Sequence, residues 1–346
     1  MPGTETIRLP AEWEPHAYCW MAWAVHGEWR THGDEVKREL RDVIATVAEY
    51  EPVRLLTPLD QIADAKRQSF GGDVEIVPAP VDDIWMRDIA PTVAFRGDEA
   101  VAVDWNFNGW GGLPGRRSRP GDRLAGFISA NMALPGVHAP FIAEGGAIVT
   151  DGKGTIITTK SCLLNENRNP AFGRSSSERM DAIENGLTHL GGRKIIWLDG
   201  DATEPITSGH ADAYVLFVRS GSVLVEGCEP DGALIPNRVT DIAALRTAED
   251  SSGGTLEITT ILPPRQRYSR FSGSSFAPCY LNAYVANGAV ITAKFGDPER
   301  DEAARKALAC AFPGRDIRML DINHIAAGGG GVHCLTQPVP SPGRGQ

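Results

Sequence analysis

Apolar and polar residues alternate with helical and strand-like periods along this chain, and the first clear stretch is helical. Over residues 34–50 the apolar positions recur at steps of 4, 3, 1 and 3. In a helix this spacing places them on one face. The positions are Val36, Leu40, Val43, Ile44 and Val47. A short strand over residues 53–56 is predicted to follow this helix.

The same order, a helix followed by a strand, recurs five more times. In one of these units Gly191 and Gly192 mark the end of the helix. The predicted pairs are 58–66 with 74–78, 122–133 with 137–141, 176–190 with 194–198, 238–247 with 255–261, and 298–312 with 316–320.

Each of the last five predicted strands is followed by a glycine-rich or polar segment with one conspicuous residue. These residues are Asp88, Glu144, Asp212, Asn282 and Cys334, at intervals of 56, 68, 70 and 52 positions. The similar intervals between these residues and the similar segments that carry them together predict about five βαβ-type units that each deliver one residue to a common centre. The alternation alone fits one doubly wound α/β sheet equally well.

No linker rich in Pro, Gly or Ser divides the chain, so we predict one domain over residues 1–340. Residues 338–346 look disordered, and we place the domain boundary so that 341–346 form the tail.

Composition and charge narrow the function classes. The 346 residues carry a formal net charge of −10, and Lys and Arg are scattered. This argues against nucleic acid as a partner and mildly favours cationic small molecules. No apolar run approaches the ~18 residues of a membrane helix, and the start has no signal-peptide pattern. We therefore expect a cytoplasmic protein that does not bind a membrane.

The six cysteines lie far apart, with no CxxC pair and no Cys/His cluster at zinc spacing. We therefore expect neither a disulfide framework nor a structural metal. Any catalytic cysteine has to be identified by its neighbours.

Residues 82–88 are the densest unusual segment. They hold three carboxylates, Trp85 and Arg87, which are costly to bury unpaired. One interpretation is a solvated loop. The other is a cation site in which Trp85 faces a planar cation and a carboxylate accepts its hydrogen bonds.

Three further segments are candidates for chemistry. Glu144 precedes two glycines, which allow a close backbone approach but alone indicate only a turn. His210 and Asp212 are two residues apart, which fits one side of a strand and a metal pair, but no third and fourth ligands are evident nearby. Four glycines, 328–331, precede Cys334 at a cost in conformational entropy that packing hardly explains. For Cys334 the alternatives are a structural cysteine or a nucleophile with His210 as its base.

Taken together, these segments resemble the agmatine deiminase family, which is related to the bacterial peptidylarginine deiminases among the guanidino-group modifying enzymes. The resemblance covers nearly the whole chain. It rests on segments 13–15, 20–23, 83–88, 104–112, 144–146, 162–170, 209–212, 280–282, 295–297 and 329–337.

The resemblance implies a five-bladed α/β propeller (pentein) with pseudo-fivefold ββαβ repeats, and a central site with no metal and no organic cofactor. Cys334 is similar to the family's nucleophile and His210 to its general acid/base. Asp88 and Asp212 match the carboxylates that bind the guanidinium, Glu144 the acid that orients the histidine, and Trp85 the aromatic beside the guanidinium. Asn282 is a further candidate for substrate binding. A homodimer is the candidate assembly.

The implied chemistry suits these residue types. A guanidinium with a pKa of about 13 is a poor electrophile until its charge is held and its geometry fixed. Two carboxylates accept its N–H donors, and the Cys334 thiolate attacks its carbon with loss of ammonia. His210 then activates water to release a ureido product. Because free cysteine, with a pKa of about 8.5, is mostly a thiol at neutral pH, His210 or the bound cation must favour the thiolate.

Departures from the family pattern leave the far end of the substrate open. They occur at Ser208, Cys279, Gly331 and the run 292–294. Agmatine ends in an amine and needs an acid or an aromatic, whereas L-arginine adds a carboxylate and needs Arg or Lys. Lys294 is a candidate carboxylate partner, or else a solvated lysine. Trp20, Trp23 and Trp110 either wall the aliphatic stem or belong to the core.

We rank hydrolysis of agmatine to N-carbamoylputrescine first and hydrolysis of L-arginine to L-citrulline second. Amidino transfer, in which an amine replaces water, is the third alternative. A non-enzymatic binding protein would not need the full set of Cys334, His210, Asp88 and Asp212. A cysteine protease has no use for paired carboxylates around its nucleophile.

Overall fold

The computed structural model describes residues 6–112, 124–172, 175–228 and 237–342. Within these ranges no helix is both long and apolar enough to cross a membrane. The strands are β1 (Ile7–Arg8), β2 (His16–Ala22), β3 (Val53–Thr57), β4 (Val74–Pro78), β5 (Thr92–Arg96), β6 (Glu99–Asp104), β7 (Gly136–His138), β8 (Val149–Thr150), β9 (Thr155–Thr159), β10 (Lys194–Leu198), β11 (Val215–Arg219), β12 (Ser222–Glu226), β13 (Glu257–Ile261), β14 (Tyr284–Ala286), β15 (Ala289–Lys294), β16 (Asp316–Asp321) and β17 (Gln337–Pro340).

Long helices and single-turn helices both connect these strands. The α-helical segments are α1 (Gly33–Ala48), α2 (Ile62–Ala65), α3 (Met86–Ile89), α4 (Gly109–Gly112), α5 (Leu124–Asn131), α6 (Lys160–Leu163), α7 (Ser176–His189), α8 (Arg238–Thr247), α9 (Pro298–Ala311), α10 (Asn323–Ala327) and α11 (Val332–Leu335). The 3₁₀ turns are η1 (Gly27–His32), η2 (Leu59–Gln61), η4 (Gly145–Ala147), η5 (Pro170–Phe172), η6 (Ala211–Ala213) and η7 (Gln266–Tyr268).

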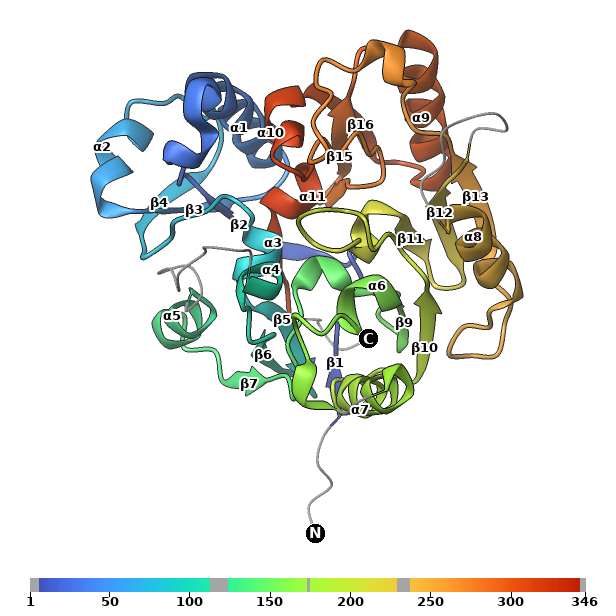
Figure 1. Ribbon diagram of the computed structural model, residues 1–346. Helices are drawn as coiled ribbons and strands as arrows, with labels where there is room; N and C mark the ends of the chain where they lie inside the picture. Colours follow the sequence, from blue (N-terminus) through green and yellow to red (C-terminus); the bar gives the residue numbers. More distant parts are fainter. Residues whose placement is uncertain (1–5, 113–123, 173–174, 229–236, 343–346) are drawn as a thin grey trace.

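The strands form five separate small sheets in the described residues. Their strand orders are β1-β5-β6-β7, β10-β9-β8, β11-β12-β13, β14-β15-β16 and β17-β2-β3-β4. The alternative of one doubly wound sheet is therefore wrong. Figure 1 shows the sheets following one another around the middle of the molecule, where α3 and α11 lie.

One pattern repeats in these sheets. Two strands pair antiparallel, a helix crosses on the outside, and a third strand pairs parallel with the second, as in β14, β15, α9 and β16. The sequence predicted the helices and the third strands, with ends that differ by a few residues. It did not predict most of the antiparallel hairpins, because their buried strands, such as β9 and β15, have no solvent-exposed face and so lack a clear apolar–polar alternation. Residues 122–123 of one predicted helix lie outside the described residues.

The two ends of the chain meet in the fifth sheet. Strand β17 near the C-terminus pairs antiparallel with β2 near the N-terminus, and β2 then pairs parallel with β3. The prediction of disorder from Pro338 onward is therefore wrong for Pro338–Pro340, since these residues belong to β17. Their prolines are tolerated because β17 is an edge strand. Residues 343–346 of the predicted tail lie outside the described residues.

The apolar faces and capping residues that predicted the helices also stabilise them in the structure. All five apolar residues of the predicted face of α1 are fully buried: Val36, Leu40, Val43, Ile44 and Val47. Helix α7 begins with a capping box between Ser175 and Glu178, and α9 begins with Asp297 as its N-cap and Pro298 in its first turn. With the helices fixed on the outside, the turns that follow each third strand are directed to the middle.

Candidate active site

Five turns, each after an edge strand of a sheet, carry the conspicuous residues of the predicted units. Asp88 lies in α3, Glu144 directly before η4, Asp212 in η6 and Cys334 in α11, while Asn282 lies between β13 and β14. Helix α3 contacts α11 and η4, and η4 contacts η6. The structure therefore brings these turns together at one place, as the common centre of the predicted units requires.

Residues 82–88 do not form a solvated loop. Asp83, Trp85, Arg87 and Asp88 are all buried. The interpretation of this segment as exposed surface is wrong, because each charge has a partner inside the protein, such as Glu12 for Arg87.

Gly146 shows how closely the polar groups converge. A Cβ atom built on Gly146 would lie 2.6 Å from His210 Nδ1, 2.9 Å from Asp212 Oδ2 and 2.9 Å from Asp88 Oδ1. These distances are too short for any real side chain, so only glycine fits. The second glycine after Glu144 is thus required by close approach of three functional groups and not by the turn alone.

The Cys334 thiol lies against the Asn282 amide and the Asp212 carboxylate. Asn282 Nδ2 donates to Cys334 Sγ at 3.2 Å, and its Oδ1 accepts from the backbone N–H groups of Gly331 and Cys334. Cys334 Sγ is 3.7 Å from Asp212 Oδ2. Burial and the carboxylates of Asp212 and Asp88 raise the pKa of Cys334 well above its usual range. Without a cation in the site this residue is a thiol.

His210 lies between two acids. Its Nε2 is 3.3 Å from Glu144 Oε2, and its Nδ1 is 3.7 Å from Asp88 Oδ1. Nδ1 is buried and has no hydrogen-bond partner among the described residues. Burial works against the charged ring, but the Asp88 carboxylate and the contacts with Cys162 and Glu144 outweigh it and raise the pKa of His210 well above its usual range. The imidazolium therefore presents Nδ1–H where Gly146 leaves room. His210 and Asp212 lie in a turn and not in the predicted strand.

The carboxylates of Asp88 and Asp212 differ in their partners. Asp88 accepts from Trp110 Nε1 at 2.8 Å and from the Gly146 N–H at 3.1 Å. Burial and the neighbouring acids nevertheless raise the pKa of Asp88. Asp212 Oδ2 is 2.8 Å from His333 Nδ1. Burial opposes its ionisation, but this histidine outweighs burial and lowers the pKa of Asp212.

Behind Asp212 lies a chain of charged groups that the sequence analysis missed. His333 Nε2 is 3.2 Å from Glu12 Oε1, and Arg87 Nη1 donates to the same oxygen at 2.7 Å. The position of His333 directly before Cys334 is the signal that could have identified it. Glu12 comes from the other end of the chain, so no local pattern joins it to Cys334.

Glu144 is also held from behind, by Arg168. Arg168 Nε donates to both carboxylate oxygens of Glu144 at 3.0 Å, and Nη2 donates to the Thr207 carbonyl at 2.8 Å. Burial opposes the charge of Glu144, but Arg168 outweighs it and lowers the pKa of this acid. Cys162 Sγ donates to Glu144 Oε2 at 3.8 Å. Arg168 and Cys162 both come from the segment 162–170.

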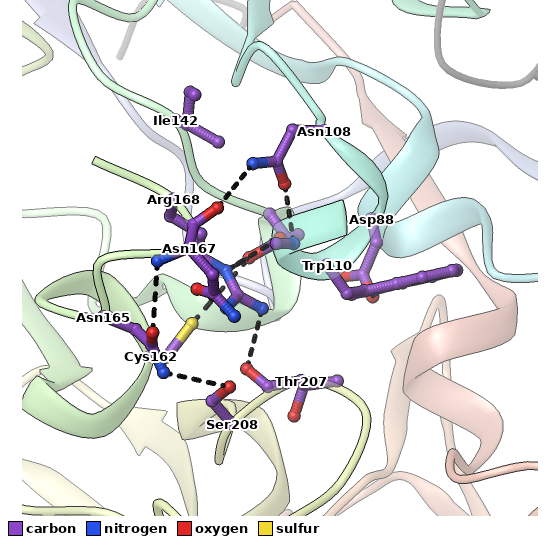
Figure 2. A network of polar contacts seen from close by, with 12 residues as sticks. Asp88, Asn108, Trp110, Ile142, Cys162, Asn165, Asn167, Arg168, Thr207 and Ser208 are labelled. Carbon is purple, nitrogen blue, oxygen red and sulfur yellow. Dashed lines mark hydrogen bonds and ion pairs between the residues drawn. The ribbon is translucent and has the colours of Figure 1, made fainter. Parts of the chain in front are cut away.

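Figure 2 shows how this segment joins two parts of the centre. On one side Asn167 accepts from Asn108 with its backbone carbonyl, and Asn108 in turn accepts from the N–H of Gly111 beside Trp110. On the other side the side chains of Asn165 and Ser208 are in contact. The turn that places Trp110 on Asp88 and the turn that carries His210 are thus tied together.

A cavity of about 390 Å³ opens beside Cys334. Its lining includes His210, Asp212, Asn282 and the glycines 329–331, so Cys334 and His210 face the same space. Three more carboxylates, those of Asp201, Glu204 and Glu226, also line the cavity, together with Tyr214, Pro263, Phe276 and Cys279. None of the described residues that line it is Lys or Arg.

Trp85 and Trp110 lie beside the site, whereas Trp20 and Trp23 lie in the core. A Cβ on Gly330 would lie 2.6 Å from Trp85 Cζ3 and 3.1 Å from Cys334 Cβ, so the Trp85 ring lies beside the loop that leads to Cys334. Trp110 is bonded to Asp88 and keeps a positive φ of 55°. Trp20 and Trp23 are fully buried in the main core, as the core alternative predicted.

Lys294 is not brought to the site. It is the last residue of β15, its side chain is exposed, and its register partner on β16 is Asp321. It is absent from the lining of the cavity. The prediction that Lys294 binds substrate is therefore corrected: its strand position directs it to solvent beside an acid.

Comparisons with known proteins agree with this arrangement. Residues 8–340 match the model of the Porphyromonas-type peptidyl-arginine deiminase family. An agmatine deiminase of Pseudomonas aeruginosa is 32% identical over 99% of this chain and 97% of its own length. The structure of the agmatine deiminase of Enterococcus faecalis has a TM-score of 0.89 at 25% identity, over 99% of both chains.

A substrate-bound variant of the agmatine deiminase of C. jejuni, with serine in place of one cysteine, shares the fold. Its TM-score is 0.83 at 23% identity, over 98% of this chain and 97% of its own. The family model covers nearly the whole chain, and the Pseudomonas relative exceeds 30% identity along its length. This chain therefore belongs to the Porphyromonas-type peptidyl-arginine deiminase family.

Proposed function

We propose that this protein hydrolyses the guanidino group of agmatine and releases ammonia and N-carbamoylputrescine. The observation that carries the proposal is that the Cys334 thiol, the His210 imidazole and the Asp212 carboxylate line one cavity, with Asp88 Oδ1 3.7 Å from His210 Nδ1. The names of the Pseudomonas and Enterococcus relatives support the same activity.

Substrate binding depends first on the attraction between the guanidinium and two carboxylates. The guanidinium lies between Asp88 and Asp212, which accept its N–H donors and replace its lost hydration. Trp85 and Trp110 close the site against water, and Trp110 also holds the Asp88 carboxylate in place. Asn282 holds the Cys334 loop through three hydrogen bonds.

The bound cation also activates the nucleophile. Burial and two carboxylates make the thiolate of Cys334 costly in the free protein. A guanidinium placed between those carboxylates cancels their negative field and thereby lowers the pKa of the thiol. The reactive thiolate then forms only when substrate is present.

The reaction proceeds in two halves. Cys334 Sγ bonds to the guanidino carbon, the imidazolium of His210 gives a proton to one amino nitrogen, and the C–N bond breaks to release ammonia. A thiouronium remains on Cys334. Neutral His210 then takes a proton from water, and hydroxide adds to the same carbon. The C–S bond breaks as the added hydroxyl gives up its remaining proton to solvent, which releases the ureido product and the Cys334 thiolate. Glu144, held by Arg168, keeps the His210 ring oriented throughout.

The charges that line the cavity favour agmatine over L-arginine. Asp201, Glu204 and Glu226 line the cavity, and no Lys or Arg lines it among the described residues. Glu226 is already paired with the buried Arg238 at 3.1 Å, so Asp201 and Glu204 supply the negative charge that an amine would meet. An amine is attracted by these acids, whereas the carboxylate of arginine meets like charge without a partner. Such juxtaposition costs several kcal/mol, so we expect kcat/KM for agmatine to exceed that for L-arginine by about 100-fold or more.

A substrate panel tests this proposal. Agmatine, L-arginine, a methylated arginine and a peptidyl arginine are incubated with the protein, and ammonia and ureido products are measured. Agmatine should be the best substrate in the absence of any acceptor amine. A higher kcat/KM for L-arginine would contradict the substrate assignment, and ammonia release that requires an added amine would indicate amidino transfer.

We also propose that the five sheets are the blades of an α/β propeller with pseudo-fivefold ββαβ repeats, in a single domain over residues 1–340. The repeated strand order and the closure of the chain ends by β17 and β2 support this description. The cytoplasmic location and the homodimer stay predictions from the sequence and the family resemblance.

A further inference from the structure

Cys162 is a buried thiol that the proposed reaction does not use, and it lies beside two residues that the reaction does use. Its Sγ, one carboxylate oxygen of Glu144 and a ring nitrogen of His210 all lie within 4.8 Å of one another. Cys162 Sγ is 3.8 Å and His210 Nε2 is 3.3 Å from Glu144 Oε2. All three residues are buried.

These distances match the edges of a metal coordination polyhedron. Zinc bonds of about 2.0–2.3 Å to N, O and S ligands in tetrahedral geometry place neighbouring ligand atoms roughly 3.3–3.8 Å apart. Thiolate, imidazole and carboxylate are also the three ligand types that zinc takes from proteins. The sequence analysis found no such cluster because its members come from three segments, at positions 144, 162 and 210.

We propose that Cys162, Glu144 and His210 form a binding site for a thiophilic divalent ion such as Zn²⁺ or Cd²⁺, and that the bound ion inhibits the enzyme. The ion bonds to Cys162 Sγ, Glu144 Oε2 and His210 Nε2, and a solvent molecule completes the coordination. The thiol proton of Cys162 and any proton on Nε2 leave to solvent.

The surroundings select the type of ion. The Arg168 guanidinium lies 3.0 Å from both oxygens of Glu144 and repels any cation placed there. Only an ion with a strong bond to sulfur and nitrogen overcomes this repulsion. Mg²⁺ and Ca²⁺ prefer oxygen ligands in larger number, so they do not bind here.

Inhibition follows because the ion occupies Nε2 of the His210 ring. With the ion on Nε2, neutral His210 carries its proton on Nδ1, the atom near Asp88 and Gly146. That nitrogen then has no lone pair to accept a proton from water, and the second half of the reaction stops. This consequence rests on the proposed function, whereas ion binding itself does not.

Ion binding is therefore measured without reference to activity. Cd²⁺ is titrated into the Cys334→Ser protein, and the ultraviolet charge-transfer absorbance of the cadmium–thiolate bond is followed. One equivalent should bind, and the additional change Cys162→Ser should abolish this signal. Cys310→Ser, which removes an exposed cysteine, is the matched control and should leave the signal in place. A signal that survives Cys162→Ser would overturn the proposal.

Diffraction keeps the proposal testable if the Cys162 variants do not fold. Crystals of the Cys334→Ser protein grown with Cd²⁺ should show an anomalous peak within about 2.5 Å of Cys162 Sγ, the range of a metal–sulfur bond. A peak elsewhere, or none near Cys162, would refute the site.

Inhibition is tested separately with buffered Zn²⁺. The inhibition constant should be at least about 10-fold weaker in Cys162→Ala than in the parent protein, because even residues that only surround metal ligands change affinity by that factor. Equal inhibition of both proteins would show that zinc acts elsewhere, for example on Cys334. If the parent protein has no deiminase activity, the cadmium titration still decides whether the ion site exists.

Discussion

Two of the buried polar clusters in the described part of the chain differ in how completely their groups are paired. The proposed catalytic centre holds Asp88, Glu144, His210, Asp212 and Cys334 beside a cavity, with His210 Nδ1 lacking a hydrogen-bond partner among the described residues. The second, here called the seam cluster, is formed by His16, Glu51, Tyr284 and Asn287.

The seam cluster lies where the sheet that joins the two chain ends meets the sheet of β14. Glu51 accepts from Tyr284 Oη and the Asn287 N–H, and one of its oxygens is 3.2 Å from His16 Nδ1. Asn287 exchanges two hydrogen bonds with the backbone of His16. Each group therefore finds its partner within the protein.

The buried polar groups of the two clusters have different roles. In the seam cluster, satisfied hydrogen bonds fix two sheets against each other and leave no capacity for a ligand. In the catalytic centre, burial and like charges hold the pKa values of Asp88 and Cys334 above their usual ranges, and only a bound cation relieves them. The first cluster should therefore govern stability and the second activity.

The largest effect is expected at the nucleophile. Cys334→Ala should lower kcat by on the order of 10⁴ or more, as loss of a covalent nucleophile does elsewhere. It should leave agmatine binding and thermal stability close to those of the parent. Ammonia release and calorimetric binding measure the two properties. Cys310→Ala, at an exposed position, is the matched control; parent-like turnover by Cys334→Ala would remove this residue from the mechanism.

Replacing one acid in each cluster should give opposite results: Asp88→Asn should mainly lower activity, and Glu51→Gln should mainly lower stability. Asp88→Asn should lower kcat/KM by about 100-fold or more, since a charged partner of the cation is lost in both ground and transition states. It should raise the free energy of unfolding by about 1 kcal/mol, in the range of stabilising changes at functional sites.

The sign of this change in stability follows from the raised pKa of Asp88. The folded state holds the Asp88 proton more tightly than the unfolded state, so ionisation of Asp88 costs stability above the ordinary carboxyl pKa. The advantage of Asp88→Asn should therefore be present at neutral pH and vanish at acid pH, where Asp88 is protonated in both states. Thermal melts from about pH 3 to 8 provide the measurement, and a variant less stable than the parent at neutral pH would contradict it.

Glu51→Gln is the counterpart in the seam cluster. It should lower the free energy of unfolding by about 3 kcal/mol because it disrupts a buried hydrogen-bonded network. The remaining folded protein should keep kcat/KM within about twofold. A strong loss of activity in protein that melts like the parent would show that the two clusters are coupled.

A smaller effect is expected at Trp110. Trp110→Phe removes the N–H that Asp88 accepts, so the pKa of Asp88 should rise further and KM should increase about tenfold at neutral pH. The acid side of the kcat/KM profile should move to higher pH. Trp105→Phe removes a similar N–H that Thr92 accepts, and its profile should not move. Parallel shifts in both variants would indicate a packing effect.

The smallest effect is expected at Lys294. Lys294→Ala should leave KM for agmatine and for L-arginine within about twofold, because this exposed side chain lies outside the cavity. A large increase in KM for L-arginine alone would restore the prediction that Lys294 binds a carboxylate.

The sequence predicted the parts of the molecule that have local signals. The buried face of α1 shows the helical period, and Ser175 and Asp297 cap α7 and α9. Cys334 and Glu144 stand out because glycines adjoin them, and these glycines are needed where Cβ atoms would collide with Trp85 and His210.

Groups that depend on distant partners could not be predicted. Glu12 reaches His333 across 321 positions, and Cys162 in α6 reaches Glu144 across 18 positions. Strands such as β15 lack the alternation that marks a half-buried strand, because both of their faces are covered. The failed prediction for Lys294 has the same cause, since its direction depends on the pairing of β15 with β16.

Trapping the covalent intermediate tests the central claim most directly. The protein is mixed with agmatine, quenched in acid within milliseconds and digested for mass spectrometry. The amidino adduct should be found on the peptide that contains Cys334, and it should disappear as substrate is consumed. Turnover at the parent rate with no adduct on Cys334, or with the adduct on another cysteine, would contradict the account.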